Sequence, residues 1–318
     1  FMRVAVLRGV RNFVVEDVPQ PEIGEDEVLI RVKACGVCTS ELYLWNGKFK
    51  GLSFPLYLGH EPSGVIEAVG KKVDGLSVGD RVTFLSEAGR CFAEYAKAKK
   101  SNIVRIPESI SFEEALGEPI ACAVNGIRRS NINVGDTVVV IGCGFMGLLL
   151  IQLANLRGPS EIIAVDINDE RLKIAEELGA DKIINPLSSD PVKYVMENTD
   201  GKGADVVIEA TGEQTPLDIA TKIVRIRGTL VIFGYHVGAP RIIDMERWNW
   251  KGLDVINAHE RSPEVYVEGM RIGIKLVSKG KLKIKPLITN TYPLEQINKA
   301  FADIDAKVKG LIKAVITP

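Results

Sequence analysis

Hydrophobic residues in the first third of the chain fall in short runs, several of which alternate with polar residues. Such alternation, with Pro and Gly between the runs, is typical of β-strands that bury one face. The pattern predicts strands over residues 4–7, 28–34, 63–69 and 81–84. We therefore expect a mostly β region before Asn133.

The pattern changes around Asn133, where apolar strand-like runs begin to alternate with helical segments. Alternating strands and helices form parallel, doubly wound sheets, because each helix connects one strand to the next. The middle of the chain is therefore predicted to be an α/β domain. Its elements are predicted at residues 137–141, after Gly147, at 162–166, 169–178, 205–209, after Pro216, and at 229–233.

This alternation stops near Glu264. A helix is predicted up to about Lys279, then an apolar stretch at Ile288, a helix from Pro293 and a last strand over residues 311–316. The tail is too short to enclose its own core, so we expect it to pack onto the first, mostly β region. A chain of 318 residues is long for one core, and two domains are expected.

One continuous apolar stretch, residues 137–154, is nearly long enough to cross a bilayer. It begins with β-branched residues, contains glycines in its middle and ends in leucines, which is typical of a buried strand, a tight turn and a helix. We therefore expect no membrane span. No secretory signal pattern follows Met2, and we expect a cytoplasmic protein.

Charge and cysteine content narrow the range of partners. The formal net charge is −1 and no basic cluster stands out, so we expect no nucleic-acid partner. The five cysteines are odd in number and irregularly spaced, which favours reduced thiols over a disulfide framework. Reduced thiols are suited to metal binding.

A glycine motif follows the first strand of the α/β region. Gly142, Gly144 and Gly147 form G-x-G-x-x-G, with Phe145 and Met146 inside it. The first glycine permits a tight turn, the second lets the backbone approach a pyrophosphate, and the third lets helix and strand pack closely. The N-terminus of the helix adds a positive dipole for the phosphates.

Asp166 ends the next predicted strand, about twenty residues after the motif, where a ribose-binding acid is expected. Its carboxylate would accept hydrogen bonds from the ribose hydroxyls and repel a 2′-phosphate, so NAD is favoured over NADP. Arg171 either serves a phosphate or lies on a solvated helix face. The alternative for the whole set is a helix-start turn followed by an unrelated capping Asp.

Three distant residues are candidate ligands of one metal. Cys38, His60 and Glu118 offer a thiolate, an imidazole and a carboxylate, which are the ligand types of zinc. A catalytic zinc site keeps one further position open for substrate. Spacing alone leaves another interpretation open, in which Cys38 is a small core residue and Glu118 caps the helix after Pro119.

The sequences around these residues resemble the zinc-containing medium-chain alcohol dehydrogenases over the whole length of the chain. The segment from Glu118 is similar to the polyol (sorbitol and inositol type) and threonine dehydrogenase branch, which has a glutamate where other alcohol dehydrogenases have a cysteine. The matching stretches are GVCTSE at Cys38, GHEPSG from Gly59 with Gly70 beyond it, GDRV at 79–82, FAEY at 92–95, EPIACAVNG from Glu118 and PLEQINKAF from Pro293.

The resemblance implies an α/β protein with a GroES-like, mostly β catalytic domain and a Rossmann NAD-binding domain. The catalytic domain is expected at residues 1–121 and 262–318, and the NAD-binding domain at 122–261. The backbone of Thr211-Gly212 and Gly234, after later strands of the sheet, is expected to line the cofactor cleft; simple turn glycines are the alternative.

The resemblance also assigns roles at the metal. Cys38 and His60 are the implied ligands, and Glu118 and Glu61 compete for the third place, with Glu118 expected in the resting site. Ser40 lies where the family has the hydroxyl that accepts the substrate proton. Glu41 is expected to orient His60.

Two features of the sequence depart from the family. Tyr43 stands where many relatives carry a histidine that ends the proton relay, so either the relay exits through water and ribose hydroxyls or Tyr43 shapes the pocket. The alternative for Tyr43 and Trp45 is plain packing. Many relatives also have four closely spaced cysteines that hold a structural zinc, whereas residues 82–92 contain only Cys91. One cysteine cannot form a closed tetrahedral site, so we predict one catalytic zinc and no structural zinc.

The predicted function is reversible, zinc-assisted oxidation of a secondary alcohol to a ketone by NAD. The expected substrates are small molecules: polyols, cyclitols, sugars or amino alcohols. Residues 252–259 match the family's last Rossmann strand, which pairs across a dimer, so a homodimer or homotetramer is expected. The rival hypotheses are a zinc-free quinone or enoyl reductase of the same superfamily and a regulator that binds NAD without turnover.

Overall fold

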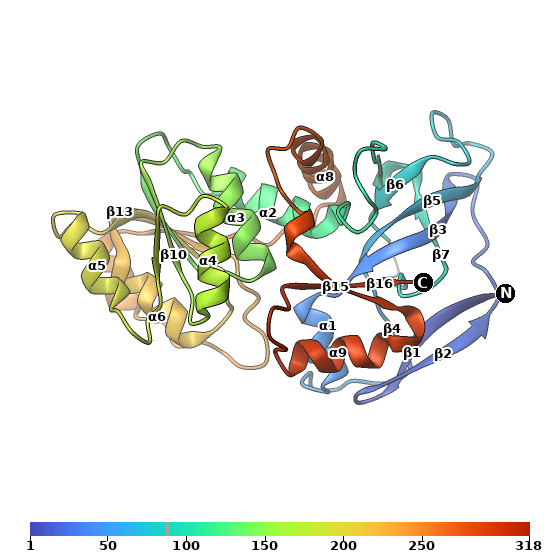
Figure 1. Ribbon diagram of the computed structural model, residues 1–318, viewed down its shortest axis with the longest axis horizontal. Helices are drawn as coiled ribbons and strands as arrows, with labels where there is room; N and C mark the ends of the chain where they lie inside the picture. The colour runs from blue at the N-terminus through green and yellow to red at the C-terminus, as the bar shows by residue number, and fades with distance from the viewer. Residues whose placement is uncertain (87–88) are drawn as a thin grey trace. The chain divides into compact units, whose positions relative to one another are not determined.

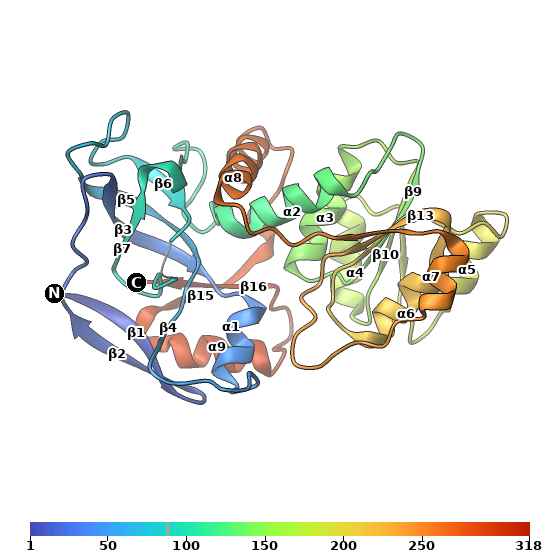
Figure 2. The ribbon, with the colours of Figure 1, turned by 180° about the vertical axis from the view of Figure 1, so that it is seen from behind.

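The computed structural model describes residues 1–86 and 89–318 and divides the chain into two compact units (Figures 1 and 2). Unit 1 comprises Phe1–Ala121 and Arg261–Pro318, and unit 2 comprises Cys122–Glu260. The C-terminal tail is thus part of the same unit as the N-terminal region. None of the described helices is long and apolar enough to cross a bilayer.

Unit 1 is mostly β. Its larger sheet pairs strands in the order β15-β16-β3-β5-β6-β8, with β7 against β3. These strands are β3 (Glu27–Gly36), β5 (Glu61–Val69), β6 (Arg81–Phe84), β7 (Tyr95–Lys99), β8 (Ile103–Arg105), β15 (Ile288–Pro293) and β16 (Lys313–Thr317). A smaller sheet, β2-β1-β4, contains β1 (Met2–Gly9), β2 (Asn12–Val18) and β4 (Leu56–Tyr57).

The tail completes the larger sheet of unit 1. Strand β16 pairs antiparallel with the end of β3, and β15 runs parallel beside β16. The helices of this unit are α1 (Thr39–Trp45), α8 (Pro263–Ser278) and α9 (Ile297–Asp305), and α2 (Gly117–Arg129) begins in it. Short 3-10 turns occur at Lys100–Asn102, Lys285–Leu287 and Leu294–Gln296.

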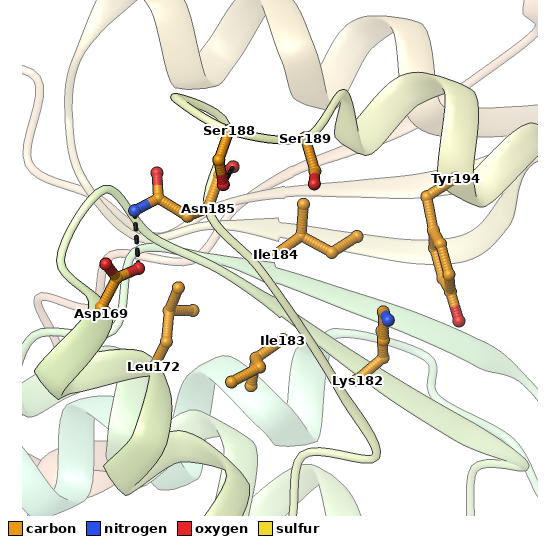
Figure 3. Close-up of a pocket in the computed structure, with 9 residues that line it drawn as sticks. All are labelled: Asp169, Leu172, Lys182, Ile183, Ile184, Asn185, Ser188, Ser189 and Tyr194. Carbon is orange, nitrogen blue, oxygen red and sulfur yellow. Dashed lines mark hydrogen bonds between the residues drawn. The ribbon is translucent and has the colours of Figure 1, made fainter.

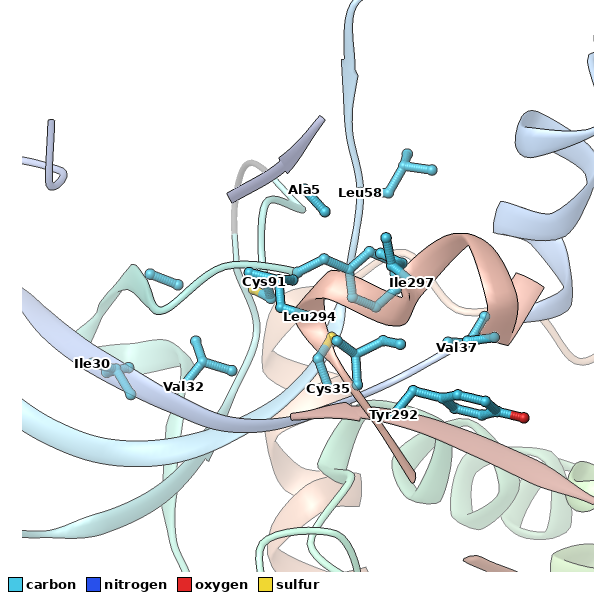
Figure 4. Close-up of a cluster of buried hydrophobic side chains, with 14 of the residues drawn as sticks. Ala5, Ile30, Val32, Cys35, Val37, Leu58, Cys91, Tyr292, Leu294 and Ile297 are labelled. Carbon is cyan, nitrogen blue, oxygen red and sulfur yellow. The ribbon is translucent and has the colours of Figure 1, made fainter. Parts of the chain in front are cut away.

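Aromatic rings and aliphatic side chains form the main core of unit 1. Phe301 of α9 contacts Phe13, Trp45 and Phe92, with ring centroids 5.0 to 5.9 Å apart. Trp45 is therefore a packing residue. Figure 4 shows the buried thiols Cys35 and Cys91 in the same core. Burial raises the pKa of Cys91 to about 12, so this thiol stays protonated at neutral pH.

Unit 2 is a parallel α/β sheet with helices on both faces (Figures 1 and 2). Its strand order is β11-β10-β9-β12-β13-β14, so the chain winds outward in both directions from β9, as the alternation predicts. The strands are β9 (Thr137–Ile141), β10 (Glu161–Val165), β11 (Lys182–Ile184), β12 (Ala204–Glu209), β13 (Val224–Ile232) and β14 (Asp254–Asn257). The helices are α3 (Phe145–Asn155), α4 (Asp169–Glu177), α5 (Pro191–Asn198), α6 (Gln214–Ile223) and α7 (Met245–Lys251).

Two differences from the sequence prediction have clear causes. Strand β13 begins at Val224, before the predicted start at residue 229, because the strand continues through an irregularity at Arg227, whose φ is 57°. The sequence pattern also missed α1, which has only seven residues. Its first turn is held by Glu41, so a local cap rather than periodicity marks this helix.

Candidate metal and dinucleotide sites

The structure brings Cys38, His60 and Glu61 together. Cys38 is the N-cap of α1, His60 directly precedes β5, and Glu61 is the first residue of β5. One potential ligand atom from each residue lies within 4.8 Å of the others. Groups of at least three Cys, His, Asp or Glu side chains can hold a metal ion. Among the described residues, Cys38, His60 and Glu61 form such a group.

Glu41 fixes the geometry of both ligand segments. The residue is 2% exposed, and its Oε1 lies 3.0 Å from His60 Nδ1 and accepts a hydrogen bond from the Gly59 amide at 2.6 Å. Its other oxygen accepts from the Cys38 amide at 3.2 Å. Because Nδ1 faces Glu41, the other ring nitrogen of His60 is left for a metal, which is the arrangement common for histidine ligands.

Ser40 lies beside the thiol. Its hydroxyl donates a hydrogen bond to Cys38 Sγ at 3.2 Å, so a proton-carrying group sits next to a candidate ligand. Burial lowers the pKa of His60, but Glu41 and Cys38 raise it more, and it lies well above its ordinary 6.5. A metal must therefore displace a proton from this ring when it binds.

Lys313 is a residue that the sequence reading missed. It lies at the start of β16, is 5% exposed, and its Nζ is 2.5 Å from Glu61 Oε2 and 2.9 Å from the carbonyl of Val37. Burial lowers the pKa of Lys313, but Glu61, Cys38 and Glu118 raise it above its ordinary value. No sequence motif marks a lone lysine in a C-terminal strand, and only the pairing of β16 with β3 brings it here.

Glu118 and Tyr43 lie outside the three-residue group. Glu118 is in the first turn of α2, and its charge acts on Lys313. Tyr43 is half-buried on α1, with Lys48 Nζ 5.3 Å from its ring centroid. The structure therefore gathers Glu61 rather than Glu118 with Cys38 and His60. The third ligand stays a prediction.

The donor set fits zinc. Thiolate, imidazole and carboxylate are its usual ligands, and three protein ligands leave one position for substrate. Glu61 Oε2 is buried and lies 2.5 Å from Lys313 Nζ. Its charge is balanced while a lone pair remains available to a metal. Of the residues 82–92 that would carry a structural-zinc lobe, 87 and 88 are outside the described part of the chain, and the count of one zinc stays a prediction.

The glycine motif forms a tight turn between β9 and α3. Gly142 has φ of 102°, a conformation that side chains disfavour, and a Cβ on Gly147 would lie 1.7 Å from the carbonyl oxygen of Gly142. Gly144 is the N-cap of α3, and a Cβ there would meet only Arg171 Nη1, at 4.0 Å. This open backbone at a helix N-terminus fits a pyrophosphate.

Asp166 lies at the carboxyl end of β10, next to this turn. Its carboxylate accepts hydrogen bonds from the amides of Cys143 at 2.7 Å and Asn168 at 2.8 Å. The acid is thus anchored to the glycine loop, as a ribose-binding residue requires. Nη1 of Arg171 lies 4.0 Å from the position that a Cβ on Gly144 would take, and the role of Arg171 stays a prediction.

Thr211, Gly212 and Gly234 follow β12 and β13, whose carboxyl ends lie at the same edge as that of β9. A Cβ on Gly234 would lie 2.2 Å from the Gly212 amide nitrogen, so the two loops touch through their backbones. The sequence reading missed the buried Glu209 and the nearby His236, which hydrogen-bond within these loops.

A cavity of about 270 Å³ lies beside β11 (Figure 3). Asp169, Asn185, Ser188 and Ser189 line it, together with apolar side chains of α4 and β11. None of the predicted site residues is among its lining residues. It therefore adds no chemistry to either site.

A thiol-imidazole-carboxylate site together with a Rossmann glycine loop defines a metal-assisted, nicotinamide-dependent oxidoreductase. Residues 24–108 match the alcohol dehydrogenase GroES-like domain and residues 146–273 the zinc-binding dehydrogenase domain. The sorbitol dehydrogenase of Halalkalibacterium halodurans is 31% identical, over 99% of this chain and 98% of the relative. The D-arabitol-phosphate dehydrogenase of Enterococcus avium is 31% identical, over 90% and 88%. The chain belongs to the zinc-binding alcohol dehydrogenase family.

Solved structures agree with this assignment. The 2R,3R-butanediol dehydrogenase of Bacillus subtilis has a TM-score of 0.87 at 28% identity, with 100% of both chains covered. A zinc-binding dehydrogenase of Sinorhizobium meliloti 1021 bound to NADP has a TM-score of 0.88 at 28% identity, covering 100% and 99%. The predicted fold class, the family, and the use of zinc and a nicotinamide cofactor are confirmed.

Proposed function

We propose that the protein oxidises a secondary alcohol group of a polyol or related sugar to a ketone with NAD, and that the reaction is reversible. The single observation that carries the proposal is the convergence of Cys38, His60 and Glu61 on one point, with Ser40 beside the thiol. The relatives named for sorbitol and D-arabitol phosphate favour polyol substrates over simple alcohols.

The chain's own residues would divide the work as follows. Cys38, His60 and one of Glu61 and Glu118 would hold zinc, which lowers the pKa of an alcohol hydroxyl when bound. Ser40 would accept the hydroxyl proton, and Glu41 would keep His60 in the ligating orientation.

On the cofactor side, Gly142, Gly144 and Gly147, with Phe145 and Met146 at the start of α3, would bind the pyrophosphate. Asp166 would bind the ribose hydroxyls, and Arg171 a phosphate oxygen. Thr211, Gly212 and Gly234 would hold the nicotinamide end, which accepts the hydride. We assign catalysis to residues 1–121 and 262–318 and cofactor binding to 122–261. Asp166 supports NAD over NADP, because its carboxylate would repel a 2′-phosphate.

A substrate panel tests this proposal. Polyols, cyclitols, sugars and amino alcohols are supplied with NAD or NADP, and formation of the reduced cofactor is followed. We expect NAD-dependent turnover of a polyol, and a loss of about 100-fold or more in Cys38→Ser, because even residues that only orient a ligand are worth 10- to 100-fold. Full activity after chelation would favour the zinc-free reductase, and no turnover across the panel would favour the NAD-binding regulator.

The third ligand can be tested separately. Glu61→Gln and Glu118→Gln each remove one carboxylate charge while preserving size. Zinc content after dialysis against a weak chelator should fall in the variant that loses the ligand and stay near wild type in the other. Metal analysis of the wild type should give one zinc per chain.

We also propose a homodimer or homotetramer that forms through β14. This strand is at the edge of the unit 2 sheet, and on one side its backbone groups have no neighbouring strand in the described part of the chain. Val255 on β14 is 39% exposed, and Trp250 of the preceding helix is 83% exposed. Light scattering should give a dimer or larger assembly, and Val255→Lys should shift it toward the monomer. A monomeric wild type would contradict this proposal.

A further inference from the structure

A buried carboxylate lies at the carboxyl end of β12. Glu209 is 0% exposed, and its Oε1 accepts hydrogen bonds from the amides of Thr211 at 2.7 Å and Gly212 at 3.0 Å. Its Oε2 lies 2.8 Å from Nε2 of His236, in the loop after β13. A charge without solvent requires such partners, since an unpaired buried carboxylate is strongly disfavoured.

The hydrogen bonds fix the proton position on His236. Its other ring nitrogen, Nδ1, lies 3.1 Å from Nε of Arg241, which can only donate. Nδ1 must therefore accept, and the ring proton must be on Nε2, where it is donated to Glu209. The three side chains form a directed chain from the guanidinium through a neutral imidazole to the carboxylate, with a net charge of zero.

The hydrogen-bonded side chains of Glu209, His236 and Arg241 join two loops. Glu209 holds the Thr211-Gly212 turn after β12, whereas His236 and Arg241 belong to the segment after β13. Arg241 also donates from Nη2 to the Gly212 carbonyl at 2.7 Å and from Nη1 to the Ala239 carbonyl at 2.9 Å. Gly212 is thus held through its amide by Glu209 and through its carbonyl by Arg241.

Two further titratable groups lie next to these three side chains. Glu213 is 3.8 Å from Arg241 and its side chain is 62% exposed, so solvent screens it. His259 Nε2 lies 3.2 Å from the carbonyl of Gly234 and supports the second loop from the segment after β14. Neither replaces the link from Glu209 through His236 to Arg241.

We propose that Glu209, His236 and Arg241 form a clamp of positioning residues that presets the two loops for the nicotinamide end of the cofactor. The inference rests on the proposed function, in which Thr211, Gly212 and Gly234 bind that end. Loops fixed before binding lose less entropy when the cofactor arrives, so the clamp strengthens cofactor affinity without touching the ligand itself.

The test is a fluorescence titration with NADH. His236→Leu removes both hydrogen bonds, whereas the His236→Gln side chain can still donate to Glu209 and accept from Arg241. We expect the NADH Kd to rise about tenfold in His236→Leu and Arg241→Met, and to stay within about threefold of wild type in His236→Gln. Arg247→Met is the matched control, because Arg247 pairs with Asp244 at the start of α7 and its side chain is 45% exposed.

Two readouts separate a clamp from a general packing role. Zinc content and the KM for the alcohol should not change in these variants, while the KM for NAD rises. Equal NADH affinity in wild type and His236→Leu, or equal losses in the Leu and Gln variants, would overturn the inference. If the wild type oxidises a polyol with NAD and the variants bind NADH normally, only the clamp fails; if the wild type binds no NADH, the cofactor assignment fails and the clamp with it.

A measurement on the wild type covers the case in which His236→Leu does not fold. The chain contains three histidines, so their ring nitrogens can be assigned by NMR. His236 should show an unprotonated Nδ1 and a protonated Nε2 at neutral pH, and its signals should shift when NADH is added. A doubly protonated ring, or signals that ignore NADH, would overturn the inference.

Discussion

Glu41 is the residue on which the geometry of the metal site depends most directly. It contacts the imidazole of His60 and the amides of Gly59 and Cys38, so one carboxylate holds both ligand segments. Removal of its charge frees the ring and weakens the first turn of α1. We therefore expect the loss of this carboxylate to lower zinc affinity more strongly than it lowers the free energy of unfolding.

We predict that Glu41→Gln weakens zinc binding by about 10- to 100-fold, the range found when a group that orients a histidine ligand is lost. Competition with a chromophoric chelator measures this directly. Glu67→Gln is the control, because Glu67 lies on β5 in a half-exposed pair with Arg31. Unchanged zinc affinity in Glu41→Gln would contradict the orienting role.

Lys313 and Glu61 form a buried pair in which each charge depends on the other. In the zinc-free protein, Lys313→Met should lower the free energy of unfolding by about 3 to 5 kcal/mol, because it leaves Glu61 buried without its counter-charge. The double variant Lys313→Met/Glu61→Gln should recover part of this loss. Urea unfolding of all four proteins gives the coupling, expected at about 1 to 3 kcal/mol.

The control for this cycle is the exposed pair of Lys72 and Glu25, whose side chains are 71% and 59% exposed. Lys72→Met should change stability by less than about 1 kcal/mol, since solvent screens such pairs. Strictly additive effects of Lys313→Met and Glu61→Gln would show that the two groups do not stabilise each other.

At the scale of elements, the turn between β9 and α3 contains glycines with two different roles, one in packing and one in cofactor binding. Gly147→Ala should destabilise unit 2 by roughly 3 kcal/mol, because the new methyl group overlaps the carbonyl of Gly142. Gly144→Ala should fold normally, since its Cβ meets open space apart from Arg171. It should nevertheless raise the NADH Kd about tenfold or more by filling the space of the pyrophosphate.

Urea unfolding and NADH titration of both glycine variants decide this prediction. Equal stability losses would mean that the two positions are both structural. Normal NADH binding by Gly144→Ala would place the pyrophosphate elsewhere.

Strands β3 and β7 are joined by an ion pair that depends on pH. Glu27 accepts hydrogen bonds from Lys97 at 2.8 Å and from the Gly24 amide at 2.6 Å. The hydrogen bond from Lys97 in particular lowers the pKa of Glu27 below its ordinary 4.5. A carboxyl with a lowered pKa in the folded state stabilises it above about pH 4.5, and this contribution disappears as pH falls through the folded-state pKa.

We therefore predict that Glu27→Gln costs about 1 kcal/mol of unfolding free energy at pH 7. The difference between variant and wild type should shrink as the pH falls below 4.5. Urea unfolding at several pH values measures both. A difference that is constant with pH would show that the cost comes from packing rather than charge.

Elements with a clear apolar pattern could be predicted, and elements without one could not. Strand β6 has the predicted bounds, and the alternation after Asn133 gave the parallel sheet of unit 2. Helix α1 and strand β11, with seven and three residues, are too short to show a period. Their formation depends on a cap and on pairing with a neighbouring strand.

At the scale of the whole molecule, the two sites belong to different units. The group of Cys38, His60 and Glu61 is in unit 1, whereas the proposed cofactor residues from Gly142 to Gly234 are in unit 2. We predict that chelation of zinc abolishes alcohol oxidation but leaves NADH affinity within about threefold of the untreated protein. NADH fluorescence before and after chelation, with zinc added back as the control, tests this. Loss of NADH binding together with the metal would contradict it.

The sequence by itself determined the dinucleotide motif with Asp166, because these residues lie in short local stretches around one strand, turn and helix. The ligand types followed from the resemblance of the stretches around Cys38, His60 and Glu118 to the zinc-containing medium-chain alcohol dehydrogenases. The tertiary structure decided which groups meet. It brought Glu61 to Cys38 and His60, paired it with Lys313 through β16, and joined Glu209, His236 and Arg241 across two loops. Most of these contacts link residues that are distant in the chain, and the pairing of neighbouring strands brings them, or the loops that follow those strands, within reach of a hydrogen bond.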